Sequence, residues 1–521
     1  MIPVVPLPTE DRRLVRKLIF ALLGVFIFLC VTTRYVGVTY DEPVYIDEGV
    51  QTAQVFRNSF NQLVHLNLVG AFESIKDGQN WTQTPMDLGF QRILNGFGLF
   101  FFGGWVDSPW LQRGATAVAW TGMLLLLFLL ARDAFGSESS GWAAMIIALG
   151  TPRLIGHGLL SCTECYLAAS WMLSLWMYLR VFKGKSPAWL LGVVCGLALM
   201  VKFQSMGLLG ALSVWGFLYA PRRAIKIFLI AFPISFLVFF AFQPLYWSHP
   251  LGQLMWLINF YAFKSTAYST SVKGPVALYF LGHTSINAPW YYAPVIWLVS
   301  TPLPYLALSL WGLWQVFRKF DPIRVLFLWM ALLPMILTMF PGVNVYDGER
   351  MFIQAYPAWV LVAAGGISSL WENRESWKRP LLAMTMAVTA FVLIQNFPFY
   401  MDYYSGAVGG PVGAQKKGFE SSYWYNALNP GMLDYLNREV PPHGGVWMDF
   451  GNLLLGYYKG AGKLRSDIEI DGGIAPGITA YKLLYLRQGY LGDIDGYLNA
   501  KAAYEVNYRG LALAKLIKVG S

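Results

Sequence analysis

Charged side chains are scarce in this chain. Asp, Glu, Lys and Arg together make up 13% of its 521 residues, about half the share of a typical soluble domain. Hydrophobic residues make up 56% and aromatic residues 16%. A disordered chain needs few apolar residues and many charges, and a soluble enzyme needs a polar surface, so the composition excludes both. A lipid bilayer is the solvent that such a sequence fits.

Cysteine is also rare, and no disulfide framework is expected. The four cysteines are Cys30, Cys162, Cys165 and Cys195, and all lie in the apolar part of the chain. Cys162 and Cys165 have the spacing of a redox or zinc motif, but no second pair accompanies them and their flanks are hydrophobic. We therefore interpret them as small packing residues.

Long apolar segments recur up to about residue 398. A membrane-spanning helix needs about 20 apolar residues, and we count eleven such segments, of which the third, fifth and sixth are short or closely abutted. They lie near residues 16–37, 111–133, 139–157, 161–182, 187–202, 204–220, 224–247, 290–317, 322–341, 351–371 and 379–398. The predicted fold class is a multi-span α-helical membrane protein with about 11 transmembrane helices and a C-terminal extracytoplasmic α/β or α+β domain.

Lys and Arg residues gather at the N-terminus and in every second break between these segments, without exception. Those parts hold 17 basic and 7 acidic residues, a difference that accounts for the whole net charge of +10. Basic residues mark the cytoplasmic side of a membrane protein. The N-terminus is therefore predicted to be cytoplasmic, and the excess charge needs no nucleic-acid partner.

Two domains are expected from this topology. Residues 1–398 form the membrane region, with long outer loops at 38–110 and 248–289. Residues 399–521 form a soluble domain on the extracytoplasmic side, where Gly and Pro separate short apolar stretches. In a bacterium this side is the periplasm and the membrane is the inner membrane.

Four carboxylates follow the first predicted helix within eight residues: Asp41, Glu42, Asp47 and Glu48. Two interpretations are open. Acidic residues and proline favour the first turn of a helix, so the segment could be a solvated helix start. A carboxylate at the membrane boundary could instead be a general base or a metal ligand.

Three more polar residues lie at the outer ends of predicted helices, in apolar surroundings. They are Arg153, His157 and Glu164. An unpaired charge in such surroundings is costly, so a cavity or a partner is expected. A cap at the start of the fourth predicted helix is the alternative for Glu164 and for His157.

Two later outer loops carry further candidates. His283 precedes the aromatic run Trp290–Tyr292, so it could bind metal or phosphate, or lie in the headgroup zone. Arg350 closes the segment Asn344-Val-Tyr-Asp-Gly-Glu-Arg350 and is predicted to lie at a helix start. A guanidinium and the free N–H groups of a helix start both favour an anion, so we interpret Arg350 as a phosphate-binding residue.

In this order, the outer segments resemble the C-type glycosyltransferases. They are most similar to bacterial relatives of the dolichyl-phosphate-mannose protein mannosyltransferases and, more distantly, to the lipid A aminoarabinose transferases. The segments are Asp41-Glu42, Pro152-Arg153 with His157 and Glu164, Pro289–Tyr292 with Thr301-Pro302, Asn344–Arg350, and Tyr403–Gly410 with Phe419-Glu420 and Tyr423-Trp424. The resemblance implies a helical bundle whose first outer loop carries in-plane helices, and residues 90–104 fit such a helix.

The resemblance also implies an activity, the transfer of a sugar with inversion from a polyprenyl-phosphate carrier to an acceptor hydroxyl. Asp41 matches the general base, Glu42 would orient the acceptor or tune that base, and Glu164 matches a second outer carboxylate. Arg350 matches a residue that faces the donor phosphate. Further candidates are His283 and Arg153 for the phosphate, and Tyr45, Tyr346, Asp347 and His157 for the acceptor and sugar pocket.

Several choices stay open at this stage. Mannose is the sugar that the resemblance suggests, and a protein hydroxyl is the favoured acceptor, with a glycolipid or lipid-linked glycan as the alternative. A transporter of lipid-linked sugar is the rival from another class, although transporters concentrate polar residues at the membrane midplane. No cofactor is certain, and the sequence leaves a divalent metal ion open because Met351 and Ser161-Cys-Thr depart from the family pattern.

Overall fold

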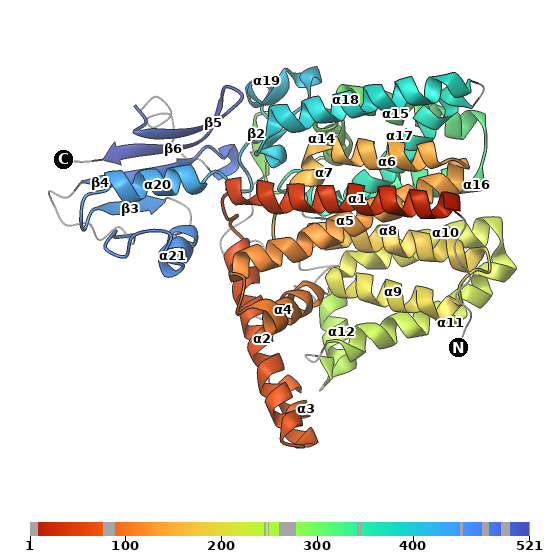
Figure 1. The fold of residues 1–521 in the computed structure, drawn as a ribbon, viewed down its shortest axis with the longest axis horizontal. Helices are drawn as coiled ribbons and strands as arrows, with labels where there is room; N and C mark the ends of the chain where they lie inside the picture. Colours follow the sequence, from red (N-terminus) through yellow and green to blue (C-terminus); the bar gives the residue numbers. More distant parts are fainter. Residues whose placement is uncertain are drawn as a thin grey trace.

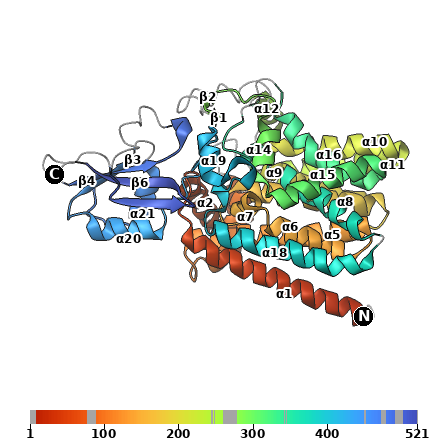
Figure 2. The same ribbon diagram turned by 90° about the horizontal axis from the view of Figure 1, so that it is seen from above.

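The computed structural model describes residues 9–76, 89–243, 246–247, 249–259, 278–340, 343, 345–372, 374–448, 452–470, 479–490 and 501–519. A long helical bundle occupies most of the molecule, and a small sheet-containing domain lies at one end of it (Figure 1). The N-terminal end of α1 and the turn between α10 and α11 lie at the opposite end (Figures 1 and 2). The side of the membrane that each end faces stays a prediction.

Each of the eleven predicted spans supplies one helix to the bundle. The bundle helices are α1 (Thr9–Thr32), α5 (Ser108–Phe135), α6 (Glu138–Leu149), α8 (Thr163–Phe182), α9 (Ala188–Val201), α10 (Met206–Tyr219), α11 (Pro221–Ala241), α15 (Leu303–Arg318), α16 (Pro322–Leu337), α17 (Ala355–Trp371) and α18 (Lys378–Asn396). Five helical segments within the described residues are long and apolar enough to cross a membrane: Arg12–Tyr35, Pro109–Phe135, Thr163–Phe182, Pro221–Ala241 and Glu375–Asn396. The prediction of an integral, multi-span helical membrane protein is confirmed.

Two of the predicted spans are interrupted helices. The segment 139–157 ends its first helix at Leu149 and continues as the short α7 (Pro152–His157). The segment 290–317 divides into α14 (Tyr292–Ser300) and α15. A proline lies at the start of α7 and just before α15, and proline cannot continue a preceding helix because it lacks the N–H group. The hydrophobic pattern runs through both breaks, so it predicted single spans.

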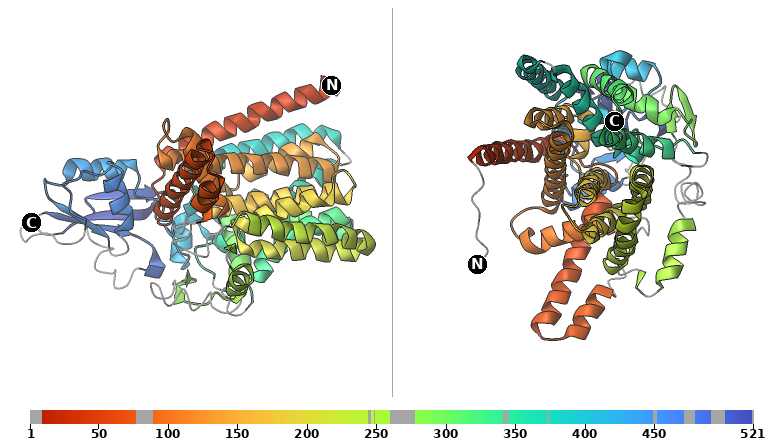
Figure 3. Two further views of the ribbon diagram at one scale, coloured as in Figure 1. Left: turned by 90° about the horizontal axis from the view of Figure 1, so that it is seen from below. Right: turned by 90° about the vertical axis from the view of Figure 1, so that its right-hand side faces the viewer.

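Within its described residues, the first outer loop contains three helices that cross the direction of the bundle. They are α2 (Glu42–Val64), α3 (Leu68–Lys76) and α4 (Phe90–Phe102), and α2 and α3 project from the side of the bundle (Figure 3). The predicted helix over 90–104 is confirmed as α4. Exposed apolar side chains on this loop include Phe60, Leu66, Phe72, Phe101 and Trp105, as expected of helices that lie at a membrane surface.

The second outer loop and the C-terminal region contain the strands. The loop holds α12 (Pro250–Asn259) and the antiparallel hairpin of β1 (Leu278–Phe280) and β2 (His283–Ser285). The C-terminal region holds α19 (Gly410–Lys416), α20 (Pro430–Glu439), α21 (Leu453–Gly460), β3 (Gly445–Met448), β4 (Ala480–Tyr485), β5 (Tyr504–Tyr508) and β6 (Leu511–Val519). The sheet has the order β3-β4-β6-β5, with β3 parallel to β4 and the other pairs antiparallel. The predicted sheet-containing domain is confirmed.

A buried ion pair fixes the start of α2 against the bundle. Arg113 of α5 donates to both carboxylate oxygens of Glu42, at 2.8 and 2.7 Å, and also to carbonyl oxygens within residues 33–37. The backbone N–H of Ser161 donates to the same carboxylate at 2.7 Å. The solvated helix start was therefore a wrong interpretation for Glu42, whose side chain is fully buried. This anchor sets the position of the neighbouring Asp41.

Replacing Glu42 should destabilise the whole fold. Glu42→Gln leaves the Arg113 guanidinium buried without a counter-charge, which costs about 3–5 kcal/mol. We expect a lower unfolding temperature and a smaller folded yield in detergent, measured by thermal unfolding and gel filtration. Glu73→Gln is the control, because Glu73 of α3 is exposed. Equal stability of the two variants would contradict the anchoring role of Glu42.

Candidate active site

Arg350 is the centre of an ion-pair cluster at the end of the bundle that carries the C-terminal domain. Its guanidinium nitrogens contact one oxygen each of Asp41 at 2.5 Å, Glu164 at 2.9 Å and Asp347 at 3.1 Å. Together, the three carboxylates and the arginine form the Arg350 cluster. One cation facing three carboxylates leaves an excess of negative charge that further cations must balance.

Three separate parts of the chain supply these carboxylates. Asp41 directly precedes α2, Glu164 lies in the first turn of α8, and Asp347 belongs to a tight turn before α17. Asp347 has φ 57° and Gly348 has φ 64°. Aspartate tolerates this left-handed region, and glycine is required next because a Cβ at Gly348 would lie 2.7 Å from Oη of Tyr423.

Among the described residues, the Arg350 cluster is most exposed at Asp41. The side chain of Asp41 is 33% exposed, whereas that of Arg350 is 12% exposed and that of Glu164 is fully buried. The guanidinium carbon of Arg350 lies 5.2 Å from the ring centre of Trp424 and 5.9 Å from that of Tyr346. Asp41 is therefore the member of the cluster that an incoming molecule meets first.

Glu164 binds a second cation inside the bundle. Nζ of Lys202, which follows α9, lies 3.1 Å from the same Glu164 oxygen that Arg350 contacts. The carboxylate makes no cap at the start of α8, so the helix-cap alternative for Glu164 was wrong. Lys202 is the last residue of the predicted segment 187–202, at its outer end, and is an exception to the predicted pattern of basic residues.

The C-terminal domain reaches the cluster through Arg487. This arginine follows β4 and contacts Asp347 at 2.6 Å and Glu420 at 3.1 Å. Burial raises the pKa of Glu420 to about 7, although Arg487 opposes the shift, and the nearby carboxylate of Asp347 adds to it. One arginine shared between two buried carboxylates cannot fully compensate both charges.

A second buried group of charges lies around Glu349. Arg153 contacts one carboxylate oxygen at 2.5 Å, Nε2 of His157 lies 3.3 Å from the other, and the hydroxyl of Tyr423 donates to both. Burial alone would raise the pKa of Glu349, but Arg153 and His157 lower it to about 2. Glu349 is therefore a carboxylate at any physiological pH, and Arg153 serves as its counter-charge.

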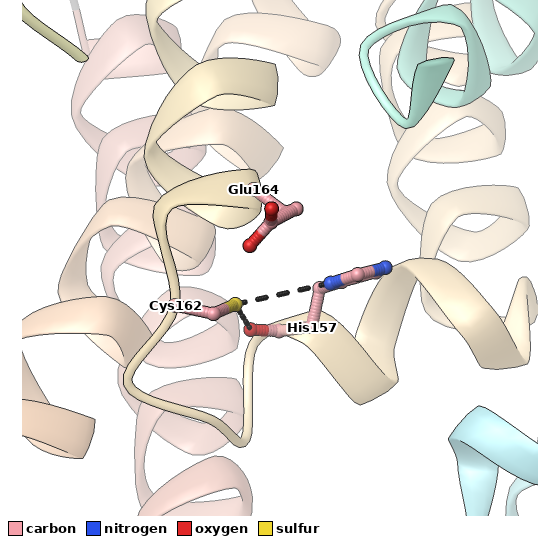
Figure 4. A group of neighbouring side chains, drawn as sticks. All are labelled: His157, Cys162 and Glu164. Carbon is pink, nitrogen blue, oxygen red and sulfur yellow. Dashed lines mark hydrogen bonds between the residues drawn. The ribbon is translucent and has the colours of Figure 1, made fainter. Parts of the chain in front are cut away.

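His157 also belongs to a compact group with Cys162 and Glu164 (Figure 4). One ligand-type atom from each of these buried residues lies within 4.8 Å of the other two. Nδ1 of His157 lies 3.8 Å from Sγ of Cys162. Figure 4 shows that the Glu164 carboxylate points toward the Cys162 thiol. A nitrogen, a sulfur and an oxygen ligand converge here, so the residues present fit a divalent metal ion.

The structure brings together most of the residues predicted for the site. Asp41, Glu164, Arg350 and Asp347 share ion pairs, and Tyr346 lies beside the guanidinium of Arg350. Tyr45, in the first turns of α2, interacts electrostatically with Arg350 as well.

Other predicted site residues lie elsewhere. Glu42 is bound to Arg113, and Arg153 and His157 are buried against Glu349. His283 is exposed on β2, outside the ion-pair network of the described residues.

The predicted helix start at Arg350 is the start of a 3₁₀ turn and not of an α-helix. Arg350 lies in a short 3₁₀ turn, Arg350–Phe352, and α17 begins only at Ala355. The free N–H groups of the α17 start are therefore not next to the guanidinium, and phosphate binding at Arg350 has to rest on side-chain charge. Because the residues from 351 onward are mostly apolar, the sequence pattern did not show that α17 begins only at Ala355.

Four site residues were not singled out from the sequence: Lys202, Glu349, Arg487 and Trp424. Lys202 carried a signal, because it is a lone cation at the outer end of an apolar segment. Glu349 and Trp424 lie within the segments that carry the family resemblance, but nothing in the sequence marked either residue as part of the site. Arg487 lies 137 positions after Arg350 in the sequence, and only the fold brings its guanidinium to Asp347.

Comparison with known proteins identifies the class of this fold. Residues 105–247 match the family model of the dolichyl-phosphate-mannose-protein mannosyltransferases. The chain has the fold of the C-type glycosyltransferases, as shown by its similarity to a solved structure of ArnT from Cupriavidus metallidurans in the apo state. That pair is 11% identical, with 98% of each chain covered and a TM-score of 0.52. The predicted resemblance is confirmed.

Two further solved structures are similar at a lower score. ArnT from Cupriavidus metallidurans bound to undecaprenyl phosphate is 12% identical, with 97% of this chain and 98% of that chain covered and a TM-score of 0.49. The apo oligosaccharyltransferase from Archaeoglobus fulgidus is 10% identical, with 89% and 69% covered and a TM-score of 0.46. A comparison with curated protein sequences gives no match.

Glu420 should make the stability of the protein depend on pH. Its folded-state pKa lies above the ordinary value of 4.5, so the folded state favours the protonated acid. Stability should be greatest below about pH 4.5 for this group and fall by on the order of 3 kcal/mol as the pH rises to about 7. We expect Glu420→Gln to flatten the pH dependence of the unfolding temperature across that range. Glu439→Gln, at an exposed position, should leave it unchanged, and identical profiles for both variants would contradict the prediction.

Proposed function

We propose that this chain is a membrane glycosyltransferase that moves a sugar, with inversion, from a polyprenyl phosphate to an acceptor hydroxyl. The observation that carries the proposal is the contact between Arg350 and Asp41, the most exposed carboxylate of the cluster. A cation suited to a phosphate and a carboxylate suited to a hydroxyl meet there, at the end of an apolar bundle. The name of the matched family, which includes a dolichyl-phosphate sugar and a protein acceptor, supports both substrate classes.

The donor phosphate is the natural ligand of Arg350. A guanidinium binds phosphate oxygens through paired, charge-assisted hydrogen bonds. When the bond from the anomeric carbon to the phosphate oxygen breaks, that oxygen gains negative charge and leaves without needing a proton. Arg350, supported by the positive charge of Lys202 behind Glu164, stabilises this charge as it develops.

Asp41 acts as the general base in this proposal. The acceptor oxygen forms a bond to the anomeric carbon on the face opposite the phosphate, and its proton passes to the Asp41 carboxylate. A direct displacement of this kind inverts the anomeric carbon and needs no covalent enzyme intermediate. The one-third exposure of Asp41 leaves room for the acceptor beside it.

The salt bridge between the two residues couples donor binding to base activity. Without substrate, Arg350 occupies the Asp41 oxygen that would accept the proton. A donor phosphate competes with Asp41 for the guanidinium, so its arrival frees the carboxylate for the acceptor. The donor therefore binds before the acceptor in the productive order.

The sugar, the acceptor and the location are proposed from the name of the matched family and from the predicted topology. We propose mannose as the sugar, a protein hydroxyl as the acceptor, and the extracytoplasmic face of a bacterial inner membrane as the location. The same chemistry on a glycolipid or lipid-linked glycan is the alternative. A transporter is disfavoured because the charged cluster lies at the end of the bundle, next to the C-terminal domain, instead of at mid-helix positions.

Purified protein supplied with a mannosyl polyprenyl phosphate and acceptor peptides or glycolipids should form a glycosylated product. Asp41→Asn should lower the transfer rate by about 10²–10⁴-fold, as expected for loss of a general base. Product is measured by mass spectrometry, which also distinguishes protein from lipid acceptors. Asp47→Asn, at an exposed position in the same acidic segment, is the control. Movement of lipid-linked sugar across vesicles without any product would favour the transporter.

Donor affinity should respond in opposite directions to the two halves of the salt bridge. Arg350→Ala should weaken binding of a short-chain polyprenyl phosphate by about 10–100-fold, because a charge-assisted hydrogen bond is lost. Asp41→Asn should leave binding unchanged or tighten it, because the phosphate no longer competes for Arg350. Arg438→Ala, an exposed arginine of α20, serves as the control. Weaker binding in both active-site variants would contradict the competition.

A further inference from the structure

We propose that His157, Cys162 and Glu164 bind one Zn²⁺ ion behind the Arg350 cluster (Figure 4). The three residues come from the end of α7, the connection that follows it and the first turn of α8. All three are buried. This inference concerns the metal alone and does not rest on the transfer activity.

The spacing of the three ligand atoms suits a tetrahedral ion. Nδ1 of His157 and Sγ of Cys162 are 3.8 Å apart. Zinc holds sulfur at about 2.3 Å and nitrogen at about 2.0–2.1 Å, so two ligands at a tetrahedral angle lie roughly 3.6 Å apart. All three ligand atoms lie within 4.8 Å of one another, so small side-chain adjustments bring them to one ion.

The hydrogen bond of the other imidazole nitrogen orients His157 as a ligand. Nε2 lies 3.3 Å from Oε1 of Glu349, a carboxylate that also binds Arg153. With the proton on Nε2 and donated to Glu349, the lone pair of Nδ1 points toward Cys162. Metal-binding histidines are commonly held in this way by a carboxylate on the second nitrogen.

Glu164 presents an oxygen that the described residues leave unpaired. Lys202 and Arg350 both contact Oε1, whereas Oε2 is buried and has no hydrogen-bond partner within the described parts of the chain. A buried carboxylate oxygen without a partner costs on the order of 1–3 kcal/mol or more. A metal ion on the side of Cys162 and His157 would satisfy it.

Charge balance also favours a cation here. The ion pairs around the site join the carboxylates of Asp41, Glu164, Asp347, Glu349 and Glu420 to the basic groups of Lys202, Arg153, Arg350 and Arg487. One negative charge is left over when Glu420 is ionised, which requires a pH above its raised pKa of about 7. Zinc held by a cysteine thiolate adds one net positive charge, which balances the site.

The ligand types select zinc over the harder cations. Magnesium and calcium prefer oxygen ligands throughout, whereas a set of sulfur, nitrogen and oxygen is typical of zinc. Three protein ligands leave a fourth position for a water molecule or a substrate oxygen. The ion would hold Glu164 in place and, through it, the guanidinium of Arg350.

The test is the metal content of the whole purified protein. Protein prepared without chelators should contain about one zinc per chain, and its X-ray absorption spectrum should show one sulfur ligand together with nitrogen and oxygen ligands. Cys162→Ala should lower the zinc content at least tenfold. Cys165→Ala is the matched control, because Cys165 is a buried thiol of the same segment that donates to the carbonyl of Thr116 and is not part of the His157, Cys162 and Glu164 group.

A measurement on the wild-type protein tests the proposal even if the Cys162→Ala variant misfolds. Co²⁺ added to zinc-depleted wild-type protein should give a thiolate-to-metal absorption band, and Zn²⁺ should remove it. Protein that binds no metal, or Cys162→Ala protein that keeps the zinc content of the wild type, would overturn the proposal. Zinc binding by a chain that transfers no sugar would instead overturn the proposed function and leave this site intact.

Discussion

The structure depends on one constraint, the need to pair every charge that the apolar bundle buries. An isolated charge in such surroundings costs several kcal/mol, and this chain buries charges at the end of its bundle in four connected places. Glu42 binds Arg113, Glu48 binds Arg92 and Glu349 binds Arg153, and the fourth place is the Arg350 cluster with its neighbours Lys202 and Arg487. Because each pair joins elements distant in the sequence, pairing fixes the outer loops to the helices. The reactive geometry is a product of the same requirement.

The Arg350 cluster differs from the other buried pairs in its incomplete compensation. Arg113 donates two hydrogen bonds to the carboxylate of Glu42, and backbone groups make further hydrogen bonds to both side chains. Arg350 divides its nitrogens among three carboxylates, one of which is partly open to the surface. A group that is fully paired stabilises the fold, whereas a group shared in this way can change partners when an anion arrives. The contrast explains why the neighbouring residues Asp41 and Glu42 have different surroundings.

The sequence predicted the membrane fold well because apolar length is a local property. It placed eleven helices and the sheet-containing tail, and it failed where an apolar run continues through a break, as at Gly150-Thr151 and Thr301-Pro302. The site was predicted in part. Asp41, Glu164, Asp347 and Arg350 were found because charge is conspicuous in an apolar chain, but Glu42 and Arg153 show that burial against a specific partner cannot be read from local composition. Arg487 and Lys202 needed the fold, since only tertiary contacts bring them to the cluster.

The contact between Arg487 and Asp347 forms late in the assembly of the site. The residues that line the cluster from the membrane region are all synthesised before residue 351, yet Asp347 receives its second counter-charge from a residue near the end of the chain. Protein synthesis runs from the N-terminus, so the membrane helices can be in place while this contact is still missing. A nascent chain therefore carries an imbalanced, incomplete cluster until the C-terminal domain has folded against the bundle. Folding of the C-terminal domain against the bundle is therefore a condition for an intact site.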